Sequence, residues 1–378
     1  GLQELEDYRL LIPAEAESKE QTSRLFDANL ARLHRIAREI VVDQTPDEFR
    51  LSGLEQISEK IDELLSKDAS HWFAGGAAWG LDSIKDFCLD RYQEAKKREP
   101  SWKDHGLILQ FIPLFDLYFY SLRACDRARE IGKASEELSR RRVDAAPDDL
   151  EALWDLGISH ERLGDLCNAE GSRQSARKYH EQSLEIREQL ASQTPDNLVA
   201  LRNLSVSYNN LGALSNAEGS RTEAREYYEK YHEITSQLVS RTPDDLQALR
   251  DLSISYERLG DLCNAEGSRT EAREYYEKDL EIAKTLVSRT PDNLQALRDL
   301  SLSYYNLGDL CNAEGSRTEA REYFEKSLEI AKNLVSRTPD DLQALRDLSV
   351  SYNKLGDLCK AEGSRTEARE YFEKSLEI

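Results

Sequence analysis

The chain has 378 residues, with 72 acidic against 51 basic side chains and a formal net charge of −21. This excess of negative charge repels phosphate backbones and anionic membrane surfaces, which argues against nucleic acid or a membrane as a direct partner. No stretch reaches the roughly 18 apolar residues of a membrane-spanning helix, and the acidic N-terminal residues do not resemble a secretory signal. We therefore expect an acidic, soluble protein of the cytoplasm.

Residues 1–146 contain irregular versions of a helical plan. Residues 31–49 and 123–150 each suggest the end of one helix followed by a new start at a proline, Pro46 and Pro147. We predict that this region is a divergent helical N-terminal cap, because a repeat array needs a cap to close off its apolar end. The apolar stretch 107–122 is too short, and too interrupted by proline, to span a bilayer. It is predicted to form the core of the cap.

The least regular part of this region is the sequence HWFAGGAAWGL at residues 71–81. Trp72, Phe73 and Trp79 flank two glycines there. One interpretation is a packed corner between two helices. The other is an aromatic docking patch for a partner or for a further domain, because exposed aromatic clusters mark binding sites.

From Pro147 onward the same phrase begins again every 48 residues, at Pro195, Pro243, Pro291 and Pro339. A fixed period of this size is typical of a stacked solenoid, in which each unit buries its apolar face only against its neighbours. We expect five units, at residues 147–194, 195–242, 243–290, 291–338 and 339–378, the last one truncated. Such an array favours recognition over chemistry.

Each unit carries signals for two helices. Thr194 is predicted to cap the first helix and Pro195 to occupy its first position. The helix is expected to run to about Glu218 and to end at Gly219 in a left-handed cap. Ser220 and Glu223 form a predicted capping box for the second helix. The box recurs as Ser268/Glu271, Ser316/Glu319 and Ser364/Glu367.

One motif within the unit matches a known family. The residues are Tyr256, Leu259, Gly260, Gly267, Ala272 and Tyr276. This order and spacing resembles the tetratricopeptide repeat, here in an elongated form, since that family's period is 34 residues and this one is 48,. The resemblance implies an all-α fold, an α-α superhelix built from antiparallel helix pairs. In the first unit His160 and His180 replace the two aromatic residues, and both are predicted to be packing residues.

The resemblance also implies where a partner binds. In the family the first helix of each pair lines the concave groove, which assigns these residues to it: Trp154, Asp165, Asn168, Arg202, Asn209, Asn216, Arg250, Glu257, Asp261, Asn264, Arg298, Tyr305, Asp309, Asn312, Arg346, Asn353 and Asp357. Asparagine amides could hold an extended peptide backbone, with arginine binding acidic side chains. The alternative is that residues such as Arg250 and Asp261 neutralise one another across neighbouring units.

Catalytic motifs are missing from the sequence. The six histidines are scattered, and neither a phosphate-binding glycine loop nor a His-Glu-x-x-His zinc helix occurs,. Cys167, Cys263, Cys311 and Cys359 share one slot of different units and are predicted to be small buried core residues. We therefore predict no enzyme activity, no metal and no cofactor.

The sequence predicts a protein-protein interaction scaffold that binds a protein or an extended peptide in its groove. The alternative hypothesis is a sensor or regulatory arm of a larger signalling protein, such as a STAND-type NTPase or a caspase-like protease, whose catalytic domain lies beyond the chain. A third is self-association through an exposed terminal unit, since the last unit stops within a helix.

Overall fold

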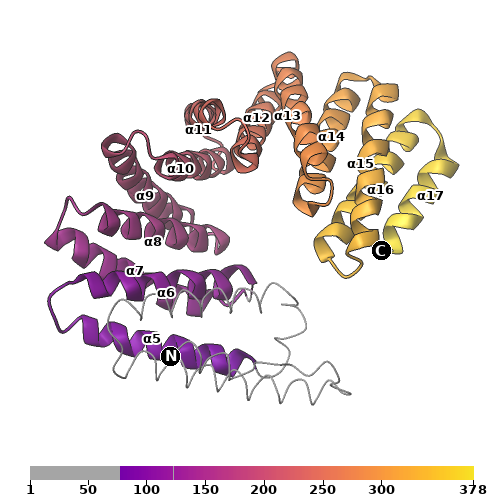
Figure 1. Ribbon diagram of the computed structural model, residues 1–378. Coiled ribbons are helices and arrows are strands. Elements are labelled where there is room, and N and C mark those ends of the chain that lie inside the picture. Colours follow the sequence, from indigo (N-terminus) through magenta and orange to yellow (C-terminus); the bar gives the residue numbers. More distant parts are fainter. Residues whose placement is uncertain (1–76, 122) are drawn as a thin grey trace. The chain divides into compact units, whose positions relative to one another are not determined.

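The computed structural model describes residues 77–121 and 123–378, and within these it contains helices and no strands (Figure 1). The expected all-α, superhelical fold is confirmed. The elements are α5 (Ala77–Ala95), α6 (Trp102–Asp116), the π-helical turn η1 (Leu117–Ser121), α7 (Cys125–Ala145), α8 (Leu150–Ala169), α9 (Arg173–Gln193), α10 (Leu198–Ala217), α11 (Arg221–Arg241), α12 (Leu246–Glu266), α13 (Arg269–Arg289), α14 (Leu294–Glu314), α15 (Arg317–Arg337), α16 (Leu342–Glu362) and α17 (Arg365–Leu376).

The chain divides into two compact units, residues 1–190 and 191–378. In the C-terminal unit the helices follow one another side by side in chain order, and each packs against the next (Figure 1). We call α10, α12, α14 and α16 the A helices, and α11, α13, α15 and α17 the B helices. Because the loops within each pair are short, the two helices of a pair run antiparallel.

The A helices begin later than the sequence predicted. The Thr-Pro-Asp segment forms a turn instead of a first helical turn, and the N-cap of α10 is Asn197, whose side chain accepts from the backbone N–H groups of Val199 and Ala200. Asp245 caps α12 in the same way. The prediction of Thr194 as the cap was wrong, because an Asx side chain three residues further on satisfies the free N–H groups.

The B helices begin where the sequence predicted, but the capping boxes do not form. Ser268 and Ser316 stand at the N-cap positions of α13 and α15, yet neither side chain makes a capping hydrogen bond. Glu319 instead accepts a 2.9 Å hydrogen bond from Arg273 of the preceding B helix. The glutamate therefore links two B helices instead of closing its own helix end.

Each helix pair is held by a close contact between a glycine and an aromatic ring. A Cβ atom placed on Gly260 would lie 2.6 Å from the ring of Tyr276, and one on Gly308 would lie 2.7 Å from Phe324. These distances are far inside van der Waals contact, so only glycine lets the ring reach the helix backbone. The predicted turn glycine is also confirmed, since Gly267 adopts a left-handed conformation with φ of 85°,.

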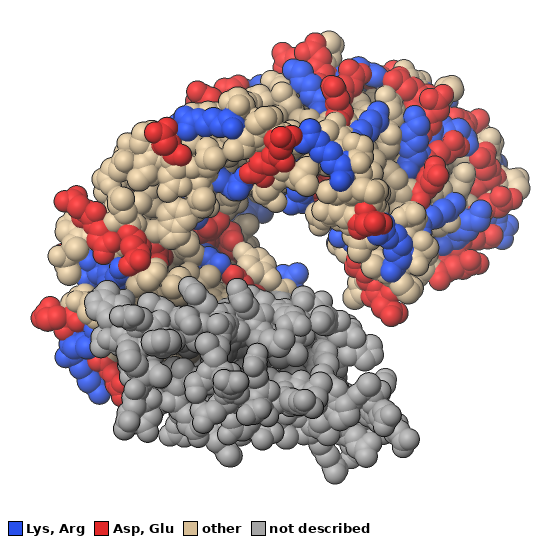
Figure 2. Space-filling view, in the orientation of Figure 1, with Lys and Arg blue, Asp and Glu red and all other residues tan. Residues whose placement is uncertain are grey.

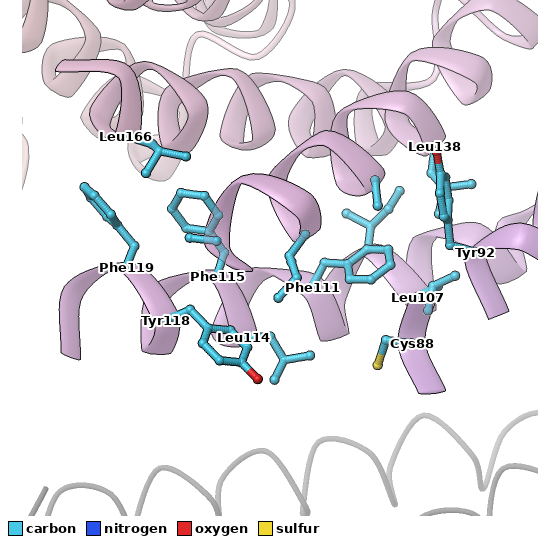
Figure 3. Packing of buried hydrophobic residues seen from close by; sticks show 14 of the residues in the cluster. Cys88, Tyr92, Leu107, Phe111, Leu114, Phe115, Tyr118, Phe119, Leu138 and Leu166 are labelled. Carbon is cyan, nitrogen blue, oxygen red and sulfur yellow. The ribbon is translucent and has the colours of Figure 1, made fainter. Parts of the chain in front are cut away.

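The N-terminal unit has an aromatic core, shown in Figure 3. Ile108, Phe111 and Phe115 of α6 are almost fully buried, together with Tyr118 of η1 and Leu138 of α7. The buried side chains between residues 107 and 119 agree with the prediction that this apolar stretch forms a core. The cap as a separate domain ending at residue 146 stays a prediction.

The shared cysteine slot is buried as predicted. Cys263, Cys311 and Cys359 have no exposed surface, and Cys167 is 5% exposed. His160 and His180, at the aromatic slots of the first helix pair, are buried as well, which agrees with their predicted packing role. Of the aromatic patch, Trp72 and Phe73 lie outside the described residues, and so does the side chain of Trp79.

Candidate interaction face

One side of the A helices presents a regular stripe of side chains, which we call the A face. On each helix it comprises an arginine, the residue four positions later, and residues seven, eleven and fourteen positions after the arginine. These spacings place all five residues on one side of an α-helix. On α12 the stripe is Arg250, Ile254, Glu257, Asp261 and Asn264.

The second position of the stripe was missed by the sequence analysis. It carries an aliphatic residue on every A helix, namely Val206, Ile254, Leu302 and Val350. Leu302 is 42% exposed and Val350 is 37% exposed, while the other two are half-buried. The helical spacing from the neighbouring arginine would have placed these residues on the same face.

The arginines of the A face bind aspartates of the next A helix. Arg202 donates to Asp245 at 2.6 Å and to Asp251 at 3.2 Å. Arg250 donates to Asp299 at 2.5 Å through Nε and at 3.3 Å through a terminal nitrogen. The partner of Arg250 is therefore Asp299, where the sequence analysis had suggested residues such as Asp261.

Arg298 repeats this arrangement one helix further on, with Asp341 at 2.8 Å and Asp347 at 3.3 Å. Arg346, on α16, is exposed and has no ion pair within the described part of the chain. In Figure 2 positive and negative side chains alternate over the C-terminal helices, and no large patch of one sign gathers in that view. The ladder of paired charges holds adjacent A helices together.

The carboxylates in the middle of α12 make no ion pair with a neighbouring A helix within the described residues; the cation paired with Glu257 belongs to its own helix. Asp261 accepts a 2.7 Å hydrogen bond from the hydroxyl of Tyr276. The carboxylate of Glu257 lies 3.6 Å from Arg258, and no hydrogen bond to it is found within the described residues. Burial raises the pKa of Glu257 to about 7, with further increases from Asp261, Asp279 and Asp299,.

Asp279 lies behind these residues on α13. It is 4% exposed and accepts a hydrogen bond from Ser253 on α12. Burial raises the pKa of Asp279 to about 6. The equivalent position is Ser327 on α15, where Ser301 and Ser327 lie 2.9 Å apart. The pair α12–α13 thus carries a buried acid where the pair α14–α15 has a neutral hydroxyl.

The middle of α14 is neutralised. Lys354 of α16 donates to both carboxylate oxygens of Asp309, at 2.8 and 2.7 Å. The same ammonium group lies 4.8 Å from the ring centre of Tyr305. Asp309 and Tyr305 are thus engaged by the neighbouring helix, whereas the cation paired with Glu257 is Arg258 of the same helix.

The remaining predicted residues differ in their access to solvent. Asn209 is half-buried, and its side-chain oxygen has no hydrogen-bond partner within the described residues. On the A helices, the exposed members of the predicted set are Asn216, Asn264, Asn312, Arg346, Asn353 and Asp357. These side chains are the ones available to a partner.

The first helix of the predicted groove, α8, belongs to the N-terminal unit. Trp154 is half-buried, and Asn168 is exposed. Asp165 accepts a 2.8 Å hydrogen bond from the hydroxyl of Tyr120, and burial raises the pKa of Asp165 to about 6. Asp165 therefore takes part in packing within its own unit.

The B helices carry a second ladder of ion pairs. Arg273 donates to Glu314 at 2.5 Å and also approaches the sulfur of Cys311 at 3.3 Å. Arg225 and Arg321 occupy the same position in the neighbouring pairs and bind Glu266 and Glu362. Arg225 is half-buried and contacts the next repeat.

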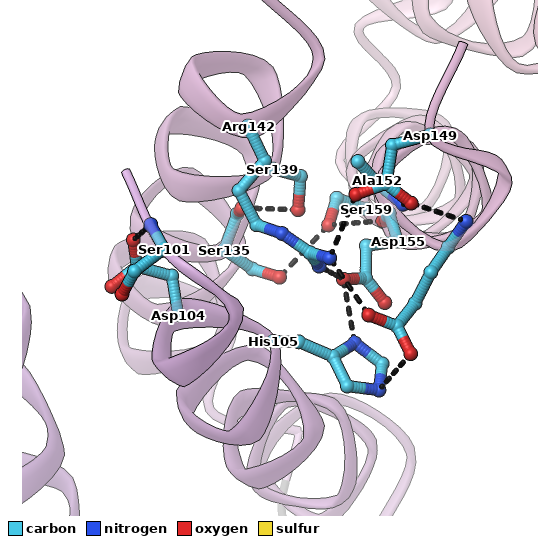
Figure 4. Close-up of polar contacts among 11 residues, drawn as sticks. Ser101, Asp104, His105, Ser135, Ser139, Arg142, Asp149, Ala152, Asp155 and Ser159 are labelled. Carbon is cyan, nitrogen blue, oxygen red and sulfur yellow. Dashed lines mark hydrogen bonds and ion pairs between the residues drawn. The ribbon is translucent and has the colours of Figure 1, made fainter. Parts of the chain in front are cut away.

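A buried polar cluster joins α6, α7 and α8 in the N-terminal unit (Figure 4). Nδ1 of His105 lies 2.8 Å from Asp155, which also accepts from Arg142. The cluster's serines, Ser135 and Ser159, lie 2.8 Å from each other. No hydroxyl is hydrogen-bonded to His105 within the described residues, so the pairing of nucleophile and base that acyl transfer needs is not formed there.

Two other kinds of site, a metal centre and a membrane-spanning helix, are not found in the described residues. Within residues 77–121 and 123–378, no group of three His, Cys, Asp or Glu residues could hold a metal ion. In that same part of the chain no helix is long and apolar enough to cross a membrane.

Comparisons with known proteins agree with the repeat architecture. Tetratricopeptide repeat models match residues 254–285 and 299–378. The crystal structure of BtubC (BKLC) from P. vanneervenii is 22% identical, covers 67% of this chain and 90% of its own, and has a TM-score of 0.51. The apo form of RapI is 13% identical over 79% of this chain and 90% of its own, with a TM-score of 0.46. Comparison with curated protein sequences gives no match.

Proposed function

The chain is a tetratricopeptide repeat protein, and on that premise we propose that it is a non-catalytic scaffold that binds a protein or an extended peptide along its A face. The observation that carries this proposal is the row of aliphatic residues at one position of four successive A helices, of which Leu302 and Val350 are more than one third exposed. A single exposed aliphatic residue is ordinary, but a row of them marks an interaction surface.

We infer different roles for the residues that the sequence placed in the groove. Arg202, Arg250 and Arg298 are engaged in ion pairs between helices, so they act as spacers that set the distance between A helices. The exposed side chains at the ends of the stripes, such as Asn264 and Asn312, carry both a donor and an acceptor. They are suited to bind the backbone of an extended segment.

The experiment is affinity capture from a native lysate with mass spectrometry. The test variant is the double substitution Leu302→Ser and Val350→Ser, which removes exposed apolar surface without changing charge. The matched control is Leu376→Ser, on the B helix α17, where the side chain is 86% exposed. We expect partners to be lost from the double variant and kept by the control. Partners retained by both would place the binding surface elsewhere.

A further inference from the structure

We propose that the A face of the C-terminal unit takes an extended segment in which basic side chains stand next to aliphatic ones, with the basic group seated on α12 beside Ile254 and Glu257. This inference deepens the proposed function and depends on it. It specifies the chemical class of the partner.

The apolar part of the inference follows from the register between A helices. The Arg250–Asp299 and Arg298–Asp347 pairs bring three A helices side by side along the first half of each stripe. Ile254 and Leu302 each lie one helical turn after one of these arginines and so occupy equivalent positions on neighbouring helices. A partner lying across the helices meets an aliphatic side chain at each one.

The charge of the partner follows from which groups are already paired. The A-face arginines Arg202, Arg250 and Arg298 are bound by aspartates of the next A helix. Glu257, in contrast, accepts no hydrogen bond within the described residues, although its side chain is only 16% exposed. The groups that face it are Asp261, Asp279, Asp299 and one cation, Arg258, which is 3.6 Å away.

A carboxylate in this position is costly to ionise, because it is withdrawn from water and has acidic neighbours. An ammonium or guanidinium group from a partner would supply the missing donors and offset the negative surplus. An acidic partner would add to the surplus. The middle of α12 therefore selects a basic side chain.

The spacing of the A helices suggests the conformation of the segment. Packed helices lie on the order of 10 Å apart, and one turn of polyproline II helix spans three residues and about 9 Å. A segment in this conformation would present every third side chain to the same position of successive helices. The anchors are therefore expected at every third residue.

The test uses fluorescein-labelled 12-residue peptides and fluorescence anisotropy at physiological salt. The first peptide repeats Leu-Pro-Lys, the second repeats Leu-Pro-Glu, and the third repeats Ser-Pro-Lys. We expect the Leu-Pro-Lys peptide to bind at least about tenfold more tightly than either of the others. Glu257→Gln should weaken its binding about fivefold, and Leu302→Ser should do so to a similar extent.

The control variant is Glu274→Gln, an exposed glutamate of α13. It removes at least as much negative charge from the chain as Glu257→Gln, so a general attraction of a basic peptide to an acidic protein would weaken at least as much in this control. Circular dichroism on each variant checks that helicity is unchanged. Equal weakening in the two glutamine variants would overturn the proposal that the basic group binds on α12.

The outcomes separate this inference from the proposed function. Preferential binding of the Leu-Pro-Glu peptide that is lost in Leu302→Ser would overturn the partner class while leaving the A face as the binding surface. Binding of none of the peptides, together with loss of a lysate partner in the Leu302→Ser, Val350→Ser variant, would also overturn the partner class and keep the scaffold function. Retention of every lysate partner by that variant would overturn both.

Discussion

Arg298 on α14 donates a 2.8 Å hydrogen bond to Asp341, the residue that caps the N-terminus of α16. One carboxylate oxygen of Asp341 accepts from the backbone N–H of Gln343, and the other binds the arginine. Although burial works in the opposite direction, these hydrogen bonds keep the pKa of Asp341 below its usual range. The residue that begins one A helix is thus also its link to the preceding one.

Removing the arginine should loosen this link. We expect Arg298→Ala to lower the free energy of unfolding by about 1 kcal/mol, since the pair is only partly buried and is hydrogen-bonded to two carboxylates. The matched control is Arg346→Ala, at the equivalent position of α16, where no ion pair is found in the described residues. Urea unfolding should show a change within about 0.5 kcal/mol for the control. Equal losses would mean that the ion pairs contribute nothing measurable.

Two substitutions at Asp341 separate its roles. Asp341→Asn keeps a capping side chain and should cost less than about 0.5 kcal/mol, because Asn293 already caps α14 in this way while Arg250 of the preceding A helix binds Asp299. Asp341→Ala removes the cap and should cost about 1 kcal/mol. Thermal unfolding of both variants measures the difference. Equal effects would show that the ion pair, and not the cap, is what matters.

The parts of the fold that depend on neighbouring residues were predictable from the sequence. The glycine at the end of α12 and the close contact of Gly260 with Tyr276 both follow from short spacings within one helix pair. The start of each A helix was not predictable in this way, because the segment Thr-Pro-Asp-Asp offers two capping side chains three residues apart. Local chemistry permits both, and the structure uses the second.

The links between helix pairs could not be predicted in this way. Arg273 and Glu319 are 46 residues apart, and only the stacking of α13 on α14 and of α14 on α15 brings them together. A glutamate that could complete a capping box in its own helix can therefore bind an arginine of the preceding repeat instead. The aliphatic row that includes Leu302 was predictable in principle, since it stands one helical turn from the arginine on the same face.

The contact between His105 and Asp155 should make the stability of the N-terminal unit depend on pH. The hydrogen bond to Asp155 is the main cause that raises the pKa of His105, which burial opposes, and Glu151 adds to the increase while Arg142 reduces it. The stabilisation is fully present below the unfolded pKa of about 6.5 and is lost as the pH rises through the higher folded value.

The variant His105→Gln tests this expectation in the full chain. It should cost about 1 kcal/mol at pH 6 and less at pH 9, because protonation of the histidine strengthens its bond to the carboxylate. Urea unfolding at the two pH values gives the comparison. His180→Gln serves as the control whose cost should change with pH in the opposite direction, because burial lowers the pKa of His180 to about 4. A cost of His105→Gln that grows with pH would contradict the assignment.

Asp279 gives a pH dependence of the same direction in the C-terminal unit, although it is an acid. Its pKa rises from 3.8 to about 6 because of burial. The folded state therefore binds the proton more tightly than the unfolded state, and the associated stability is fully present below about pH 3.8 and lost as the pH rises through 6. At pH 8 the protein carries a buried carboxylate that has the hydroxyl groups of Ser253 and Ser303 beside it and no cation among the described residues to balance its charge.

The next helix pair shows what relieves this cost, because Ser327 occupies the same position and lies 2.9 Å from Ser301. We expect Asp279→Ser to raise the free energy of unfolding at pH 8 by about 1 to 2 kcal/mol, and the gain to shrink towards pH 4, where the wild-type carboxyl is protonated. The reciprocal variant Ser327→Asp should destabilise at pH 8. If Asp279→Ser lowered stability at both pH values, the buried acid would be a packing requirement of its pair, and the two helix pairs would not be interchangeable at this position.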